Sequence, residues 1–404
     1  MKRYLQIDTK RNFSIATVWI NGGSNMDKIG KRGLNHILCS LLVRECKGYD
    51  NLALSDLIES FGAELNHEVI EDGILISIKS LDSYFNEIFP ILDLILNEPI
   101  LSEKQFKIVK KCTLNTLKKE KENPFNICFE NWRKIVYKSH PYAFNSIGNE
   151  KDITNISYQD ILTEYKKFKS RKKFLISNSL IIKQECIEVQ DIECASEEFI
   201  YSNFHKNKEK RFASFFNESN QIIMMLGNQT CSRKSKDFLP LKVLESHLSF
   251  GMSSILFKLF RENNGITYDL GVLNSIKREN APFLVYLSVS NKNGLLAFKL
   301  LSKIWHELLF STISEEEISL AKEKLKSSFL ISNQSLDNIF NRKIQLLGYE
   351  MSPNADDDFF SEIDTVSSSK IKEIANKYLS NPYLSNTGEK RKCLEIKEKW
   401  INNF

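Results

Sequence analysis

The eight cysteines of this 404-residue chain form no C-x-x-C pair. They are spread along the whole sequence, at Cys39, Cys46, Cys112, Cys128, Cys186, Cys194, Cys231 and Cys393. Disulfide frameworks belong to short secreted chains with closely spaced cysteines, and this pattern does not fit them. We therefore expect reduced, buried thiols in a cytoplasmic protein.

The sequence also lacks a long apolar run. The most apolar stretch, residues 88–96, is short and contains Asp93, whereas a helix that crosses a bilayer needs about 20 apolar residues. Residues 1–20 begin with basic side chains but contain no apolar segment of the kind found in secretory signals. We expect neither a membrane span nor a secretory signal.

A strong charge of one sign is missing as well. The formal net charge is +5, and the basic residues are not gathered into one long cluster. Nucleic-acid binding needs such a cluster on one face, so we expect no nucleic-acid partner. The basic run around Lys166 (KKFKSRKKF) is interpreted as solvated surface.

What the chain does have is enough apolar material for a sizeable core. Hydrophobic residues make up 42% and charged residues 26% of the sequence, as in globular proteins. A chain of this length is too long for one ordinary core, and two domains of about 200 residues each are the default.

Hydrophobic periodicity predicts an alternation of strands and helices in the first half. The predicted strands are 13–20, 64–69 and 73–78, and the predicted helices are 33–45, 54–61, 84–96 and 102–120. Gly62 is placed to end the second helix in a left-handed conformation. The same order recurs in the second half, with strands at 222–226 and 283–289 and helices at 239–260, 295–309 and 314–329.

One local match supports an internal repeat. SEKQFKIVKK from Ser102 and SEEEISLAKE from Ser314 lie 212 residues apart. With the matching element order, this match predicts two homologous halves. We predict an α+β fold of two α/β-sandwich halves, each a mostly antiparallel sheet covered by helices. The expected boundaries are 1–183, a charged linker at 184–211, and 212–404.

Three passages together resemble the pitrilysin/insulinase family of metallopeptidases, in its processing-peptidase-like subgroup. They are GLNHILCSLLVRE with DLIESFGAELN, then LKKEKENP with HPYAFNSIGNEKDITNIS and DILTEYKKF, and finally LFRENNGITYDLG. The resemblance covers most of the chain. The order of the three passages makes it specific, although each motif alone is only moderately so.

The first passage resembles the family's H-x-x-E-H helix, where two histidines bind zinc and the glutamate activates water. Here His36 stands at the first ligand, Cys39 at the general base and Ser40 at the second histidine. The family spacing to the last ligand, a glutamate, leads to Thr116. A neutral thiol is no carboxylate base, and hydroxyls are poor zinc ligands. We expect no zinc in this chain.

Another metal site on the same helix is an alternative. His36 and Cys39 are spaced to share a helix face, and His67 or Glu64 could add further ligands. The favoured interpretation is that Cys39 packs as a small apolar residue and His36 bonds locally. If such a metal site existed, the whole chain could be an active peptidase with an unusual zinc site, which is a further alternative for its function.

The third passage keeps a feature that the resemblance ties to catalysis. In the family an Arg and a Tyr seven positions apart face the zinc, and here they match Arg261 and Tyr268. A guanidinium and a phenol can donate hydrogen bonds to the developing oxyanion of peptide hydrolysis. Gly265 between them lets the chain turn from helix to strand. His140, in the H-P-Y of the second passage, is interpreted as structural.

Members of this subgroup work as pairs of related chains, and in some bacterial pairs one chain carries the zinc and the other the Arg/Tyr pair. The resemblance therefore implies a non-catalytic subunit that assists a homologous, zinc-bearing partner on a peptide substrate. It also implies that the peptide binds as an added strand at a sheet edge. A purely structural or peptide-binding scaffold is the alternative. Whether the chain forms a homodimer without its partner stays open.

Overall fold

We analysed a computed structural model, which describes residues 4–7, 12–179, 208–267 and 269–404. The chain divides into two compact units. Unit 1 consists of Met1–Lys119, Phe144–Glu198 and Ser335–Ala355, and unit 2 of Glu120–Ala143, Phe199–Gln334 and Asp356–Phe404. The predicted linker, 184–211, lies outside the described residues except for its last four.

Unit 1 is built on a five-stranded sheet in the order β1-β5-β2-β4-β3. Its pairs are antiparallel except β1 with β5. The strands are β1 (Tyr4–Gln6), β2 (Phe13–Asn21), β3 (Glu64–Val69), β4 (Gly73–Leu81) and β5 (Lys173–Ser177). The helices are α1 (Leu34–Leu42), α2 (Asn51–Ser60), α3 (Phe85–Asn97), α4 (Glu103–Glu122), α6 (Glu150–Asn155), α7 (Tyr158–Lys169) and α11 (Leu336–Gly348). The core of this unit lies between the sheet and helices α1, α3, α4 and α7.

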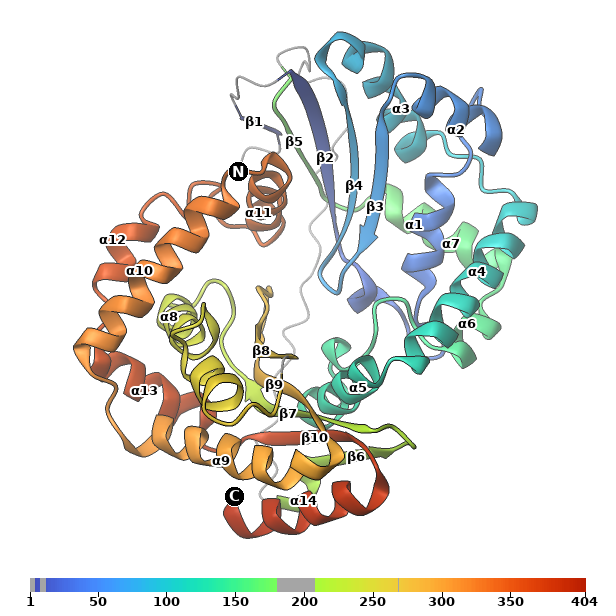
Figure 1. The fold of residues 1–404 in the computed structure, drawn as a ribbon. Coiled ribbons are helices and arrows are strands. Elements are labelled where there is room, and N and C mark those ends of the chain that lie inside the picture. Colours follow the sequence, from blue (N-terminus) through green and yellow to red (C-terminus); the bar gives the residue numbers. More distant parts are fainter. Residues whose placement is uncertain (1–3, 8–11, 180–207, 268) are drawn as a thin grey trace. The chain divides into compact units, whose positions relative to one another are not determined.

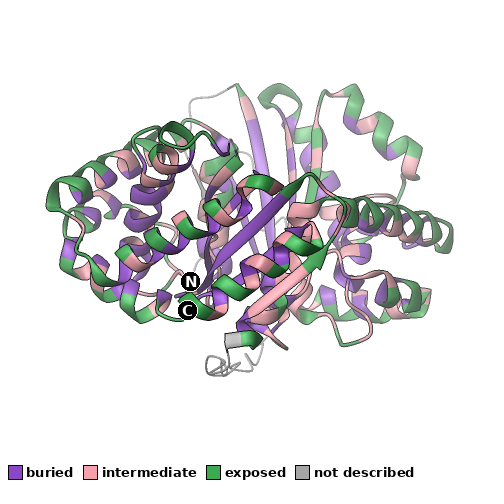
Figure 2. Cartoon of the chain, turned by 60° about the horizontal axis from the view of Figure 1, so that its bottom comes forward, coloured by how far each residue is buried: buried purple, intermediate pink, exposed green. Residues whose placement is uncertain are grey.

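Unit 2 repeats this plan, with a sheet in the order β6-β10-β7-β9-β8. Only β6 with β10 is parallel. The strands are β6 (Phe212–Phe216), β7 (Gln221–Gln229), β8 (Asp269–Asn274), β9 (Pro282–Ser290) and β10 (Tyr383–Gly388). The α-helices are α5 (Pro124–Tyr137), α8 (Phe238–Ser249), α9 (Gly294–Phe310), α10 (Glu315–Ser332), α12 (Phe359–Asp364), α13 (Ser368–Leu379) and α14 (Lys390–Asn403). In both units the helices turn buried faces inward and exposed faces to solvent (Figure 2).

The predicted fold class and the predicted repeat are confirmed. Strand order and the one parallel pair correspond between the sheets. The local match is also structural, because Ser102 and Ser314 each accept a hydrogen bond from the backbone three residues on, at the starts of α4 and α10. The two matched segments also share a pattern of burial. The equivalent residues Phe106 and Ile318 are both buried, and the equivalent residues Ile108 and Leu320 are both exposed.

Each unit takes one helix from the part of the sequence that otherwise builds the other unit. Figure 1 shows green α5 beside the strands of unit 2 and orange α11 beside the blue strands of unit 1. In unit 2, Trp132 of α5 is fully buried and its indole nitrogen donates to the carbonyl of Tyr383 at 3.3 Å. In unit 1, α11 ends against Trp19, whose ring leaves no room for a Cβ at Gly348. Periodicity alone did not reveal this exchange.

The predicted helix 239–260 is wrong in one respect, because it is two elements. α8 ends at Ser249, and Phe250 is extended. Gly251 then takes a φ of +74°, a left-handed conformation that ends helices and favours glycine. A second helical segment follows at Phe257–Glu262. Gly62 has a φ of +57° after α2, as predicted.

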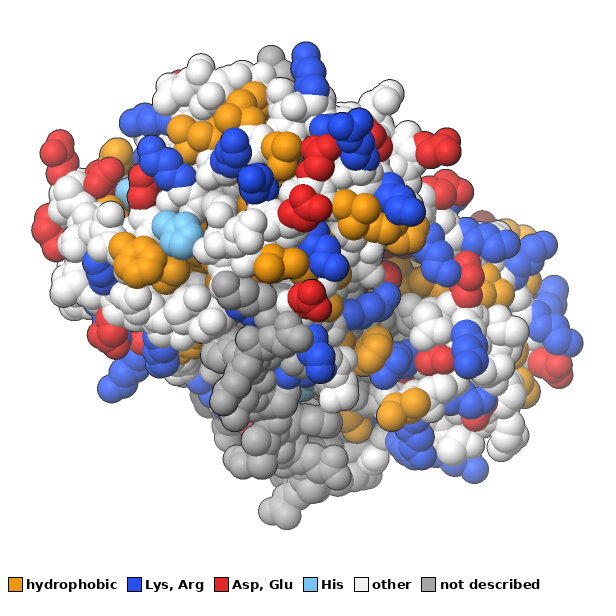
Figure 3. Space-filling model, turned by 90° about the horizontal axis from the view of Figure 1, so that it is seen from below, with side chains coloured by type: hydrophobic (Ala, Val, Ile, Leu, Met, Phe, Trp, Pro, Cys, Tyr) orange, Lys and Arg blue, Asp and Glu red, His pale blue; other side chains and the backbone are white. Residues whose placement is uncertain are grey.

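The surface carries both signs of charge. On the face drawn in Figure 3, Lys and Arg are interspersed with Asp, Glu and apolar side chains. No helix in the described part of the chain is both long enough and apolar enough to cross a bilayer.

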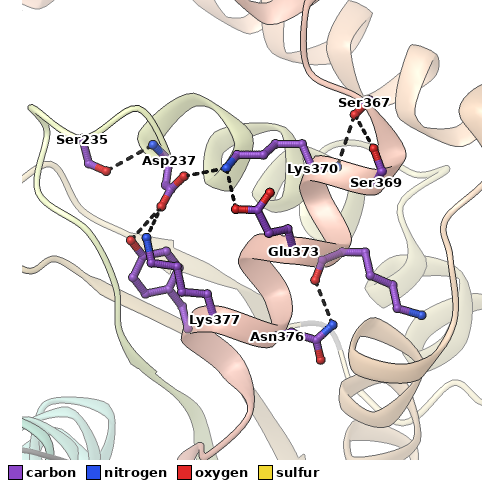
Figure 4. A network of polar contacts seen from close by, with 10 residues as sticks. Ser235, Asp237, Ser367, Ser369, Lys370, Glu373, Asn376 and Lys377 are labelled. Atoms are coloured by element: carbon purple, nitrogen blue, oxygen red, sulfur yellow. Dashed lines mark hydrogen bonds and ion pairs between the residues drawn. The ribbon is translucent and has the colours of Figure 1, made fainter.

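A buried carboxylate joins α8 to α13 in unit 2 (Figure 4). Asp237, just before α8, accepts hydrogen bonds from Lys377 Nζ at 2.6 Å and from the Tyr378 hydroxyl at 2.9 Å. Lys370 Nζ lies 3.1 Å from its other oxygen. Burial alone raises the pKa of Asp237, but these donors outweigh burial and lower its pKa to about 2. The ionised carboxylate is therefore the form that stabilises the fold.

We predict that Asp237→Asn lowers the free energy of unfolding by about 1 to 2 kcal/mol at pH 7, a range reduced because the lysines face solvent. A depressed carboxyl pKa adds stability above the unfolded pKa, 3.8 here, and this stability is lost as pH falls toward 2. Denaturant midpoints of wild type and variant should therefore converge between pH 4 and pH 2. A difference that stays constant over that range would contradict the assignment.

Candidate functional site

A buried polar network positions α1, the helix that carries the degenerate zinc motif. Asp27 accepts hydrogen bonds from the backbone N–H groups of Gly33 at 2.7 Å and Asn35 at 3.0 Å. Arg171 donates to Asn35 Oδ1 at 2.8 Å and pairs with Glu164 of α7. These bonds satisfy donors at the start of the helix, which otherwise have no partner. They fix the helix on which His36, Cys39 and Ser40 lie.

Cys39, at the position of the general base, points into the core rather than into a site. Its side chain is fully buried and packs in the apolar cluster of unit 1. Burial raises the pKa of the thiol far above its usual range. The group is therefore neutral at physiological pH and cannot take a proton from water. The prediction that Cys39 packs as a small apolar residue is confirmed.

His36 and Ser40 lie one turn apart on the half-buried face of α1. Burial, together with the nearby imidazole of His67, lowers the pKa of His36 to about 4. His67, on the edge strand β3, lies with Nε2 3.2 Å from Ser40 Oγ. Desolvation and the charge of Arg44 lower the pKa of His67 as well. Both imidazoles are thus neutral at pH 7.

Thr116, the residue at the family's last ligand position, is exposed on α4. It lies off the buried face of that helix, which is formed by Gln105, Phe106, Val109, Thr113 and Leu117. A threonine hydroxyl in water is no zinc ligand.

These residues do not fit the zinc site of an active peptidase. Among the described residues, no group of three or more His, Cys, Asp or Glu side chains is arranged to hold a metal ion. The thiol of Cys39 is buried away from the His36 face, so the alternative pairing of His36 with Cys39 has no geometric support. No step of peptide hydrolysis can be assigned to this chain's own metal.

Arg261 belongs to unit 2 and lies in a short π-helix, Phe257–Glu262. The wider turn is visible in the hydrogen bond from Asn263 N–H to the Lys258 carbonyl, five residues back, at 2.9 Å. Such turns occur often at functional sites. The Arg261 side chain is exposed, and its guanidinium lies 5.0 Å from the centre of the Phe257 ring.

Gly265 ends this segment with a φ of +58°, and its N–H donates to the Arg261 carbonyl at 3.2 Å. The predicted turn from helix to strand at Gly265 is confirmed. Tyr268, the predicted partner of Arg261, lies outside the described residues. Its role stays a prediction, as does that of Arg261.

His140, interpreted from the sequence as structural, ties the end of α5 to the loop between β8 and β9. Its Nδ1 accepts from the Tyr142 N–H at 3.2 Å, and its Nε2 lies 3.6 Å from Glu279. The Tyr142 hydroxyl in turn accepts from the Glu279 N–H at 3.3 Å. The H-P-Y segment thus holds the exchanged helix in unit 2.

Comparison with known families agrees with this geometry. Residues 3–150 match the family described as Insulinase (Peptidase family M16), and residues 192–325 match the Peptidase M16 inactive domain. The chain belongs to the insulinase family. It groups with the inactive members, since residues 192–325 match the inactive domain and its relatives include a protein named as a non-peptidase homologue.

Some relatives of this chain are named as proteases and one is named as a non-peptidase. The chain is 22% identical to an "Uncharacterized zinc protease" of Rickettsia bellii, over 89% of this chain and 88% of that protein. It is 20% identical to "Non-peptidase homolog YmxG" of Helicobacter pylori, over 87% and 83%. It is also 20% identical to the mitochondrial-processing peptidase subunit beta of Saccharomyces cerevisiae, over 93% and 86%.

Solved structures share the fold over nearly the whole chain. A peptidase M16 inactive domain from Pseudomonas fluorescens superposes with a TM-score of 0.82 at 18% identity, covering 96% of this chain and 95% of that one. A protease from Helicobacter pylori superposes with a TM-score of 0.82 at 16% identity, covering 95% of this chain and 96% of that one. The insulinase fold therefore spans both units.

We predict that Cys39→Glu destabilises unit 1 by about 3 to 5 kcal/mol, because the substitution buries an unpaired charge in the apolar core. Cys39→Ala should cost only about 1 kcal/mol, the loss of a small buried group. Cys112→Glu is the matched control, since Cys112 is exposed on α4. Denaturant unfolding followed by tryptophan fluorescence measures all three. Equal stability of Cys39→Glu and Cys112→Glu would show that position 39 faces solvent.

Proposed function

We propose that this chain is the non-catalytic subunit of a heterodimeric zinc metallopeptidase of the insulinase family. A homologous partner would hold the zinc and cut the peptide. The observation that carries the proposal is the contrast between two positions. Cys39 is neutral and buried where the base should be, whereas Arg261 is exposed where the family places its substrate-binding arginine. The eight cysteines are spread along the sequence, and the six that the structure describes are free thiols, which supports a cytoplasmic location.

Arg261 and Tyr268 would contribute to the partner's reaction by polarising the scissile carbonyl. Negative charge grows on that oxygen in the transition state, and a fixed guanidinium and a phenol stabilise it. Arg is suited to this role because it stays protonated and offers several donors. The π-helix and the Gly265 turn support the role, because they present Arg261 at an exposed helix end.

The edge of the unit 1 sheet supports peptide binding. Among the described strands β3 pairs only with β4, so its outer edge keeps backbone donors and acceptors without a described strand beside it. An extended peptide can add there as a further strand. A hollow of about 340 Å³ lies beside this edge, lined by β2, β3, β4 and α11, with Glu68, Lys79, Asp337 and Phe340 among its side chains.

The second candidate function is a scaffold that binds peptides or partners without assisting hydrolysis. The same strand edge favours it, because peptide binding there needs neither Arg261 nor a metal. A neighbouring reading frame of similar length with an intact H-x-x-E-H would favour the heterodimer. The absence of such a frame would favour the scaffold.

The test is co-expression with a zinc-bearing homologue and assay of the purified complex. We predict that Arg261→Ala combined with Tyr268→Phe lowers kcat/KM by about 100- to 1000-fold, the cost of losing oxyanion donors. The complex should still elute as a heterodimer. Arg391→Ala, which removes an exposed arginine on α14, is the control and should change little. Full activity of the double variant would refute the catalytic role, and binding without dependence on either residue would favour the scaffold.

A further inference from the structure

The face of α1 that would carry zinc in an active relative has a new set of side chains. His36, Ser40 and Arg44 are four residues apart in sequence, so they form one stripe along α1 and the turn after it. His67 reaches this stripe from β3, where its Nε2 lies 3.2 Å from Ser40 Oγ. The cluster of His36, Ser40, Arg44 and His67, called here the remnant cluster, therefore lies between α1 and the free sheet edge.

The remnant cluster carries a positive charge and no negative one. Arg44 is half-buried, and the one hydrogen bond of its guanidinium within the described part of the chain, at 3.4 Å, goes to the neutral Asn51. It forms no ion pair with any described carboxylate. Its charge is felt at His67, whose pKa it lowers. A permanent cation without a counter-ion is the arrangement that binds anions.

A metal ion fits this cluster poorly. The two imidazoles could each offer a lone pair, but no carboxylate or thiolate of the described residues joins them in a metal-binding group, and the Arg44 guanidinium repels a cation. An anion fits the cluster better, because the guanidinium, the Ser40 hydroxyl and the imidazole N–H groups can all donate hydrogen bonds to it. The replacement of the glutamate base and the ligand glutamate has thus turned a cation site into a site with donors and positive charge.

We propose that the remnant cluster binds a carboxylate of an extended peptide lying beside β3. On β3, side chains alternate between the two faces of the sheet, and His67 is on the same face as Leu65 and Val69, which pack toward α1. A peptide strand added to β3 would direct every second side chain toward the cluster. The carboxylate is either an acidic side chain of the peptide or its free C-terminus. This inference rests on the proposed peptide binding, and it specifies the class of peptide.

The first experiment measures peptide binding to the purified chain by fluorescence anisotropy. The probes are matched labelled peptides with a central Asp or Asn, each with a free or an amidated C-terminus. A charge-assisted hydrogen bond predicts about 10-fold or tighter binding of the acidic form. The comparison of Asp with Asn tests binding of a side-chain carboxylate, and the comparison of free with amidated C-termini tests binding of the terminal carboxylate.

Arg44→Gln should abolish the preference while weak binding of the neutral peptide continues. Lys47→Gln is the matched control, because Lys47 is an exposed cation three residues further on that pairs with Glu98, and it should keep the preference. Equal affinities for Asp and Asn peptides at both kinds of terminus, or a preference that survives Arg44→Gln, would overturn the proposal.

A second measurement separates this proposal from peptide binding as such. The chain has only six histidines, so the ring signals of His36 and His67 can be assigned with His36→Ala and His67→Ala variants. Both signals should shift saturably with N-acetylaspartate amide and not with N-acetylasparagine amide. Failure of all peptides to bind, with these shifts present, would refute the peptide role but keep the carboxylate site. No shift with the acid, or a saturable shift with zinc alone, would overturn the carboxylate site.

Discussion

The packing of α1 against the unit 1 sheet is the constraint on which the rest of the account depends. One face of this helix is filled by leucine, isoleucine and cysteine side chains in a closed apolar core. Cys39 belongs to that face, and a neutral thiol there contributes to stability and not to chemistry. The other face is held in place by Asp27, Asn35 and Arg171 and presents His36 and Ser40. This helix therefore carries no carboxylate base beside a set of metal ligands, and the proposed function assigns hydrolysis to a partner.

The two units share one plan but differ in what their equivalent regions present. Unit 1 offers a free strand edge beside a cluster of imidazoles, a hydroxyl and a guanidinium. Unit 2 offers an exposed arginine on a π-helix that ends at a left-handed glycine. Each exchanged helix is buried in one unit, α5 in unit 2 through Trp132 and α11 in unit 1 through the contact of Gly348 with Trp19. Each unit thus depends on sequence from the other part of the chain for its folding.

Much of the fold could be predicted from the sequence, because strand and helix periodicities are local. β3 and α3, for example, appear within one residue of their predicted positions. The exchange of α5 and α11 could not be predicted, since an apolar stripe does not reveal which sheet it packs on. The break after Ser249 was missed because the one glycine at 251 gave too weak a signal within an apolar run.

The candidate site, like the fold, could be predicted from the sequence only in part. The resemblance located His36, Cys39 and Ser40, and the chemistry of a thiol and a hydroxyl was enough to predict the loss of zinc. The approach of His67 to Ser40 depends on how β3 lies against α1, which no sequence spacing specifies. The spacing of His36, Ser40 and Arg44 was visible in the sequence, but its meaning depends on the fold, in which Arg44 forms no ion pair with any carboxylate that the structure describes.

The most direct test of the central claim is peptide hydrolysis by the purified chain alone, with zinc added and with a chelator added. The account predicts no hydrolysis above background under either condition and no stoichiometric zinc in the protein. Hydrolysis of peptides by the isolated chain that a chelator abolishes would contradict it.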